Sequence, residues 1–90
     1  MPKLRPSTID VENRTVIASI KYGMEMADVD PSELATVMQT SAKTVYTRFK
    51  HPEEFRLREL RAVSKKLHIP LEQLISGKPV TAEQFTRRLA

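Results

Sequence analysis

The residues best suited to binding chemistry lie in a short segment near the middle of the chain. On a helix over residues 42–50, the outward positions carry a methyl group, two ammonium groups, a phenol and a hydroxyl, on Ala42, Lys43, Lys50, Tyr46 and Thr47. An ordinary solvated helix more often alternates Glu and Lys. No acidic residue occurs from Leu34 to His51, so nothing in this segment repels phosphate. Such a helix is suited to the major groove of DNA, where side chains meet base edges.

Catalytic and metal-binding arrangements are poorly represented. His51 and His68 are seventeen residues apart, and no cysteine accompanies them. Residues 28–32 imitate the start of a calcium loop, but Pro31 and Glu33 occupy positions where such a loop needs flexibility and glycine, so helix capping explains this segment better. No glycine-rich phosphate loop and no pair of nucleophile and base emerges. We therefore expect no enzymatic activity, no cofactor and no metal site.

The charge is distributed unevenly along the chain. The 90 residues carry 15 Lys and Arg against 11 Asp and Glu, a formal net charge of +4. Residues 1–30 hold four basic and five acidic groups, whereas residues 41–66 hold eight basic and three acidic groups. Concentrated positive charge is what phosphate neutralisation needs, although a merely basic surface would show the same pattern. Arg48 could instead pair with Glu53, Glu54 or Glu59 and hold the corner that follows its helix.

Size and composition indicate one small domain. Ninety residues suffice for a single compact unit, and the absence of cysteine fits a reducing cytoplasm. No apolar run approaches the roughly 20 residues needed to cross a bilayer. The basic start of the chain, with Lys3 and Arg5, is not followed by the apolar stretch of a signal peptide. We expect a cytoplasmic protein with no membrane partner.

Apolar residues recur at helical spacing, and strand signals are nearly absent. We predict five helices, over about Asp10–Ala27, Pro31–Met38, Ala42–Lys50, Phe55–Leu67 and Ile69–Gly77. The inner stripe of the first helix is predicted to consist of Val16, Ile17, Ile20, Met24 and Ala27. That of the fourth is predicted to consist of Leu57, Leu60, Val63 and Leu67. Gly23 interrupts the first helix and indicates a close approach of a neighbour. Residues 1–9 are predicted to form a flexible arm, residues 10–78 the domain, and residues 79–90 a tail with a short helix.

Two successive stretches of the chain resemble a known family. Val29-Asp-Pro-Ser-Glu-Leu-Ala35, followed by Gln39-Thr-Ser-Ala-Lys-Thr-Val45, is similar to the helix-turn-helix of phage repressor, Cro and XRE-type regulators. The segments 44–67 and 69–77 are similar to the fourth and fifth helices of that family. The resemblance covers roughly residues 16–77. It implies an all-α fold, a compact lambda repressor-like bundle of about five short helices, to which a short C-terminal tail helix is added.

The resemblance also assigns roles to residues. Base-reading positions are implied for Ala42, Lys43 and Thr47, with Tyr46 either touching a base or packing at the edge of the protein. Phosphate contacts are expected of Pro31, Ser32, Ser41, Thr44, Lys50 and Arg58, the first two through the helix dipole. Two positions depart from the family. Gln39 replaces the glycine often found in the turn, so it either takes a positive φ or shapes the turn differently, and Ala42 can only touch a thymine methyl group or leave room.

Two functions remain open from the sequence. The first is a transcriptional regulator that binds a double-stranded DNA operator as a homodimer, with neither a membrane nor a small-molecule substrate as partner. Its dimer contact would use the fifth helix and the tail, unless the tail folds back on the first helix. The second is the same fold diverted to protein–protein interaction, as an adaptor or an antitoxin-like partner. A diverted domain is expected to lose Lys43, Thr47 and the local positive charge, and this chain keeps them.

Overall fold

The computed structural model describes residues 8–76, and these residues form helices and turns with no strand. The elements are α1 (Thr8–Ala27), α2 (Pro31–Met38), α3 (Ala42–Lys50), the 3₁₀ turn η1 (Pro52–Glu54), α4 (Leu57–Leu67) and α5 (Leu71–Ile75). The predicted compact all-α bundle of five helices is confirmed, although α1, with 20 residues, is longer than the short helices expected. The predicted arm (1–9) and tail (79–90) fall almost entirely outside the described residues. No helix in the described part combines the length and the apolarity needed to span a membrane.

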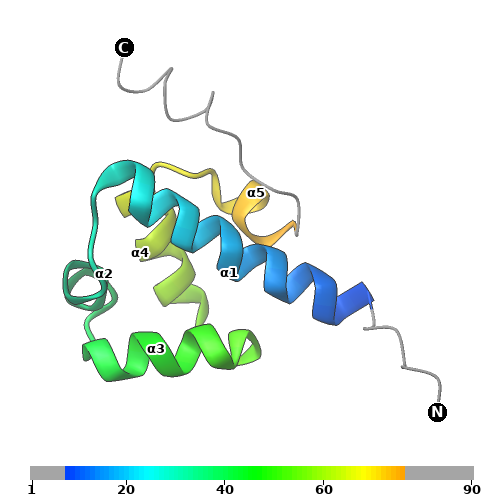
Figure 1. The fold of residues 1–90 in the computed structure, drawn as a ribbon, viewed down its shortest axis with the longest axis horizontal. Helices are drawn as coiled ribbons and strands as arrows, with labels where there is room; N and C mark the ends of the chain where they lie inside the picture. The colour runs from blue at the N-terminus through cyan, green and yellow to red at the C-terminus, as the bar shows by residue number, and fades with distance from the viewer. Residues whose placement is uncertain (1–7, 77–90) are drawn as a thin grey trace.

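The helices are arranged around α4. The long helix α1 runs along one side of the bundle and α3 along the opposite side, while α2 lies at the end where α1 finishes (Figure 1). Helix α2 packs against both α3 and α4, and α4 also contacts α1 and α5. Helix α3 is therefore held mainly by α2 and by η1, the turn that follows α3 in the chain. The side of α3 that faces away from the bundle stays free.

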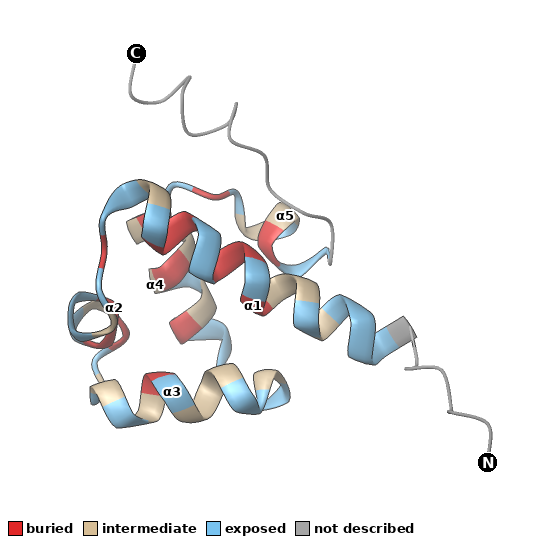
Figure 2. Ribbon diagram, in the orientation of Figure 1, coloured by how far each residue is buried: buried red, intermediate tan, exposed pale blue. Residues whose placement is uncertain are grey.

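Every α-helix contributes to a single apolar core, and the buried residues lie mainly where the helices face one another (Figure 2). The core comprises Ile17, Ile20, Met24, Val29, Leu34, Ala35, Met38, Val45, Val63, Leu67, Ile69 and Leu74. Burying one such aliphatic side chain contributes about 1.5–3 kcal/mol. Since Val29 lies in the corner between α1 and α2 and is 9% exposed, it fixes the direction in which α2 leaves α1.

Two of the predicted inner residues are exposed. Ala27 is exposed because α1 ends there and Asp28 turns into the left-handed region at φ 55°. Leu57 is 55% exposed because it is the first residue of α4. The buried face of this helix is formed by Glu59, Val63 and Leu67. The prediction that Leu57 joins the inner stripe is therefore wrong, and a carboxylate takes the place expected for an aliphatic side chain.

The limits of α2 follow from two local signals. The Asp30 carboxylate accepts a hydrogen bond from the Glu33 backbone N–H at 2.8 Å, and Pro31 fits the first helical position because no hydrogen bond is lost there. At the other end, Gln39 takes φ 58° and ψ 46°. Of the two possibilities predicted for this turn, a positive φ at Gln39 is therefore the one observed. The Gln39 backbone N–H donates to the Thr36 carbonyl, so the left-handed turn ends α2 without glycine.

Gly23 gives α1 its close approach to the segment that leaves α4. A Cβ atom at this position would lie 3.1 Å from Cδ1 of Ile69 and 3.2 Å from Cδ1 of Leu67. The neighbours are thus side chains of the core, and their packing accounts for a glycine in the middle of a helix.

Candidate nucleic-acid interface

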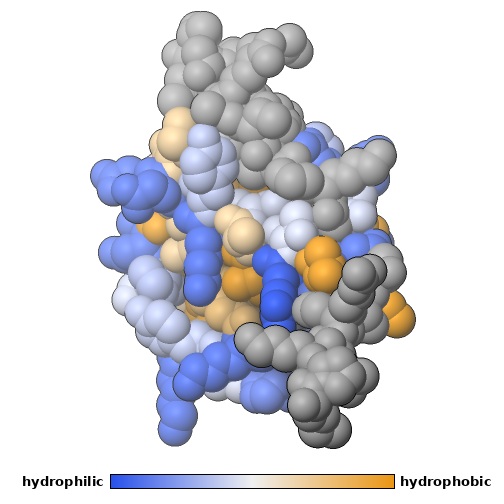
Figure 3. Space-filling view, turned by 45° about the vertical axis from the view of Figure 1, so that its right-hand side comes forward, coloured by the Kyte–Doolittle hydropathy of each residue, from blue (hydrophilic) through white to orange (hydrophobic). Residues whose placement is uncertain are grey.

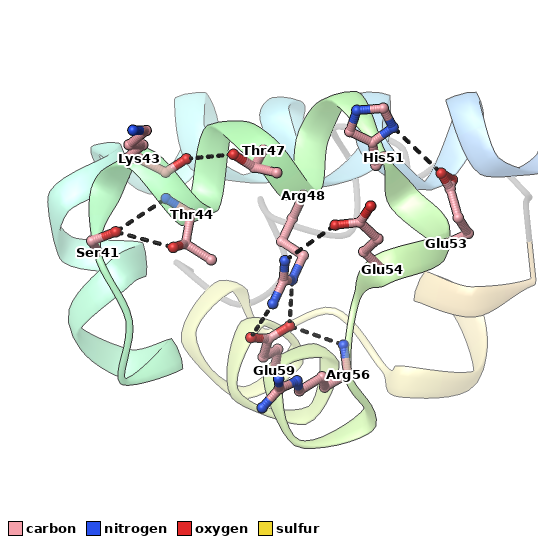
Figure 4. Close-up of polar contacts among 10 residues, drawn as sticks. All are labelled: Ser41, Lys43, Thr44, Thr47, Arg48, His51, Glu53, Glu54, Arg56 and Glu59. Atoms are coloured by element: carbon pink, nitrogen blue, oxygen red, sulfur yellow. Dashed lines mark hydrogen bonds and ion pairs between the residues drawn. The ribbon is translucent and has the colours of Figure 1, made fainter.

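The start of α3 is fixed by hydroxyl groups. The Ser41 hydroxyl oxygen accepts a hydrogen bond from the Thr44 backbone N–H at 3.2 Å and lies 3.0 Å from the Thr44 hydroxyl (Figure 4). Ser41 is exposed and Thr44 half-buried. Since a hydroxyl has one donor and two acceptor sites, this pair can still offer one hydrogen to a phosphate oxygen after the helix is capped.

The outer face of α3 carries the predicted base-reading residues. Lys43, Tyr46 and Lys50 are exposed, whereas Ala42 and Thr47 are half-buried. The Thr47 hydroxyl donates to the Lys43 backbone carbonyl at 3.1 Å, so its free groups are a methyl and an oxygen that accepts. On the opposite face Val45 is fully buried and anchors the helix in the core. The structure therefore brings these five residues to one helix, with Lys43 and Lys50 as its exposed charges.

Arg48 turns away from that face toward α4. Its Nε atom donates to Glu59 Oε1 at 3.0 Å and its Nη1 atom lies 3.6 Å from Glu54 Oε1 (Figure 4). The Glu59 carboxylate also accepts the Arg56 backbone N–H at 2.9 Å, which caps the start of α4. The sequence predicts that Arg48 either contacts phosphate or pairs with a nearby glutamate. The ion pair with Glu59 and Glu54 is confirmed, and it joins α3 to the start of α4.

The protonation of this pair reflects its burial and its hydrogen bonds. Burial raises the pKa of Glu59, but the hydrogen bonds from Arg48 and from the Arg56 backbone, together with the charges of both arginines, outweigh it and hold the pKa below its ordinary value. The hydrogen bond to Glu59 raises the pKa of Arg48. Both groups are therefore charged at neutral pH, and together with Glu54 they add no positive charge to the surface of α3.

The start of α2 is less suited to phosphate than the sequence indicates. Pro31 has no N–H group, and the Asp30 carboxylate already accepts the Glu33 N–H. Ser32 is exposed and keeps its hydroxyl at the surface. The carboxylates of Asp30 and Glu33 thus both lie at the start of α2. Only that of Glu33 has an ion-pair partner among the described residues, the Lys66 ammonium, which lies 3.9 Å from Glu33 Oε2.

Arg58 lies at the other end of α2. Its Nη1 atom donates to the Met38 carbonyl at 3.3 Å, so the guanidinium stabilises the end of α2 beside the turn that leads to α3. The side chain is exposed and keeps further N–H groups for an anion.

Two features of the surface were not predicted from the sequence. The Lys21 ammonium group lies 5.5 Å from the centre of the Phe49 ring, beside a groove that Tyr46 and Lys50 also line. Ligand atoms of His51, Glu53 and Glu54 lie within 4.8 Å of one another, all on exposed residues. The His51–Glu53 contact of 3.5 Å and the Glu54–Arg48 ion pair account for this cluster within the chain. Lys21 and Phe49 are distant in sequence, and His51, Glu53 and Glu54 lie at the 3₁₀ turn η1, so α-helical periodicity gave no signal for either feature.

Comparison with family models, with characterised proteins and with solved structures found no match to this chain.

Proposed function

We propose that this chain is a sequence-specific double-stranded DNA-binding protein that regulates transcription, with α3 in the major groove. The observation that carries the proposal is the division of α3 into two faces. Val45 and Arg48 fix one face to the domain, and the opposite face carries exposed Lys43 and Lys50 without any acidic side chain. An anchored helix with a free face of this kind suits groove entry.

Each residue of the interface except Tyr46, which stays open between a base contact and packing at the edge of the protein, has a proposed task. Lys43 would donate to guanine or phosphate, and Thr47 would offer its methyl group to thymine or its oxygen to a base amino group. Ala42 leaves space beside them. The phosphate contacts are proposed for Ser32, Ser41, Thr44, Lys50 and Arg58. The dipole of α2 at Pro31 contributes least, since the Asp30 carboxylate caps that helix.

The proposed assembly is a homodimer on a pseudo-palindromic operator, with half-sites about one helical turn apart. One helix of nine residues reads few base pairs, so two copies are needed for a long site. Exposed apolar side chains at the start of α1 and on α5, Ile9 and Ile75, offer surface for a second copy, since neither belongs to the core. Figure 3 brings the right-hand side of Figure 1 forward and shows hydrophobic patches among hydrophilic residues. A protein of this kind would work in the cytoplasm of a bacterial or phage-infected cell, without catalysis or a cofactor.

The test is selection of bound sequences from a random double-stranded DNA library with the full chain. The recovered sequence is then titrated at two salt concentrations beside random DNA. We expect a two-fold symmetric motif whose half-site spacing gives the dimer geometry. Failure to enrich any motif, with weak and salt-sensitive binding to all DNA, would reject this function and favour the protein-interaction role.

A matched pair of lysine variants separates base reading from general attraction. Lys43 on α3 and Lys65 on α4 are both exposed, and each change to alanine removes one positive charge. We expect Lys43→Ala to cost about 1–3 kcal/mol on the selected sequence and less on random DNA. Lys65→Ala should affect both DNAs alike. Equal losses on both DNAs for Lys43→Ala would remove Lys43 from the base-reading residues.

A further inference from the structure

A groove on the flank of α3 has the features of a small-molecule site. It lies between the second half of α1, the corner that leads to α2, and α3, and it encloses about 550 Å³. Its apolar lining consists of Met24, Val29, Pro31, Tyr46 and Phe49. Ligand sites in proteins have volumes of about 300–1,000 Å³ and are mainly apolar, with a few polar groups that set orientation. The groove meets these requirements of size and lining.

The charges around the groove favour a cation. Its rim holds three carboxylates and two ammonium groups, those of Glu25, Asp28 and Asp30 and of Lys21 and Lys50. The groove therefore has a net charge of −1, whereas the whole chain has a net charge of +4. Within residues 8–76, Glu25 and Asp28 form none of the ion pairs. Both carboxylates are exposed at the groove and remain available to a bound ammonium group.

One aromatic ring of the groove, that of Phe49, already holds a cation. The Lys21 ammonium lies 5.5 Å from the centre of the Phe49 ring, within the distance at which a ring attracts a positive charge. Tyr46 precedes Phe49 by three residues, so both rings lie on one flank of α3, and Tyr46 is 54% exposed. Lys21 therefore acts as an internal stand-in for a ligand cation, and Tyr46 supplies a second ring that is open to solvent.

We propose that this groove binds an organic cation with an apolar body, an aryl- or alkylammonium compound. Its positive group would lie between Tyr46, Glu25 and Asp28, and its body on Met24 and Val29. An anion of the same shape would meet the excess of carboxylates and bind less well. The site requires no DNA, so it stands or falls independently of the regulatory function.

The probe is benzyltrimethylammonium, added to the full chain without DNA and followed by amide chemical shifts in NMR spectra. Phenylacetate, which has a similar ring and the opposite charge, is the control ligand. We expect saturable shifts at Met24, Val29 and Tyr46 with the cation, and weaker or absent binding of phenylacetate. Equal binding of both compounds, no saturation, or shifts confined to another region would overturn the proposal.

Three variants at exposed positions test the chemistry without disturbing the core. Tyr46→Ala should weaken the binding of benzyltrimethylammonium about two- to fivefold, as expected for one exposed ring, while Tyr22→Ala on α1, outside the groove, should leave it unchanged. Asp28→Asn should also weaken it, since asparagine tolerates the left-handed conformation at φ 55° and only the charge is lost. Lys21→Met should strengthen it by removing the competing cation. Unchanged affinity in all three variants would refute the assignment.

Discussion

Replacing Glu59 by glutamine tests how α3 is held in place. Glu59 is 1% exposed, and its carboxylate accepts hydrogen bonds from Arg48 Nε at 3.0 Å and from the Arg56 backbone at 2.9 Å. Glutamine can keep the oxygen that accepts both bonds, but it places an amide donor where Glu59 Oε2 accepts from Arg48 Nη2 at 3.5 Å, so this hydrogen bond and the buried negative charge opposite the arginine are lost. Losses of this kind amount to about 1.5–3 kcal/mol for the hydrogen bond and up to about 5 kcal/mol when a buried pair is broken.

We expect Glu59→Gln to lower the free energy of unfolding by about 2–3 kcal/mol, because Arg48 keeps Glu54 as a second partner at 3.6 Å. In a domain of this size such a loss lowers Tm by roughly 10–20 °C. Thermal unfolding followed by far-UV circular dichroism measures it. The matched control is Glu54→Gln, which removes a carboxylate from the same arginine at a side chain 50% exposed and should cost less than about 1 kcal/mol. Equal effects of the two substitutions would refute the assignment of Glu59 as the group that holds α3.

The same pair predicts a pH dependence. Since the pKa of Glu59 is lower in the folded protein than its ordinary value of 4.5, its contribution to stability is present above that value. The contribution is lost as the pH falls through the lowered pKa of the folded state. The native chain should therefore lose more stability than Glu59→Gln on acidification below about pH 4.5. Parallel pH profiles of the two proteins would contradict the direction of the shift.

Two further substitutions test the backbone. Gln39→Gly should raise the free energy of unfolding by about 0.5–1 kcal/mol, because glycine adopts φ 58° without the cost that a side chain imposes. Denaturant unfolding measures the gain, and a lower midpoint would contradict it. Gly23→Val should lower stability by about 1–3 kcal/mol, since its Cβ would lie 3.1 Å from Ile69 and 3.2 Å from Leu67 and its branches need more room. An unchanged midpoint in the same assay would show that these neighbours yield freely.

Local signals were enough to predict the short helices. The limits of α2 and α3 follow from Asp30 with Pro31, from Ser41, and from His51 before Pro52, each of which acts within a few residues, and the structure has both helices as predicted. Helical spacing found most of the core face of α4, since Val63 and Leu67 are buried and Leu60 packs against the core, but it missed Glu59. Glu59 is buried because Arg48, eleven residues earlier in the chain, neutralises it, and spacing along one helix cannot show such a partner.

The candidate site shows a similar division between local and long-range information. The predicted residues of α3 do share one helix, since their positions follow from helical spacing alone. Helical spacing does not show which polar groups are already hydrogen-bonded within the protein and which remain free. The hydroxyl of Thr47 is turned to the Lys43 carbonyl, and the groove beside Phe49 arises where α1 and the corner before α2 approach α3. Which groups remain free for a ligand is decided by tertiary contacts.

The count of positive charges in residues 41–66 therefore overstates what DNA would meet. Of the eight basic side chains there, Arg48 is neutralised by Glu59 and Glu54, and Lys66 by Glu33. Each phosphate contact changes the slope of log affinity against log salt by about −0.9, so contacts from the proposed Lys43, Lys50 and Arg58 alone give about −2.7 per protomer, contacts from all six remaining basic side chains about −5.4, and contacts from all eight about −7. A slope no steeper than about −5.4 would agree with tertiary ion pairs that persist on DNA. A slope of about −7 would require Arg48 to leave Glu59, and the corner that fixes α3 would then have to rearrange on binding.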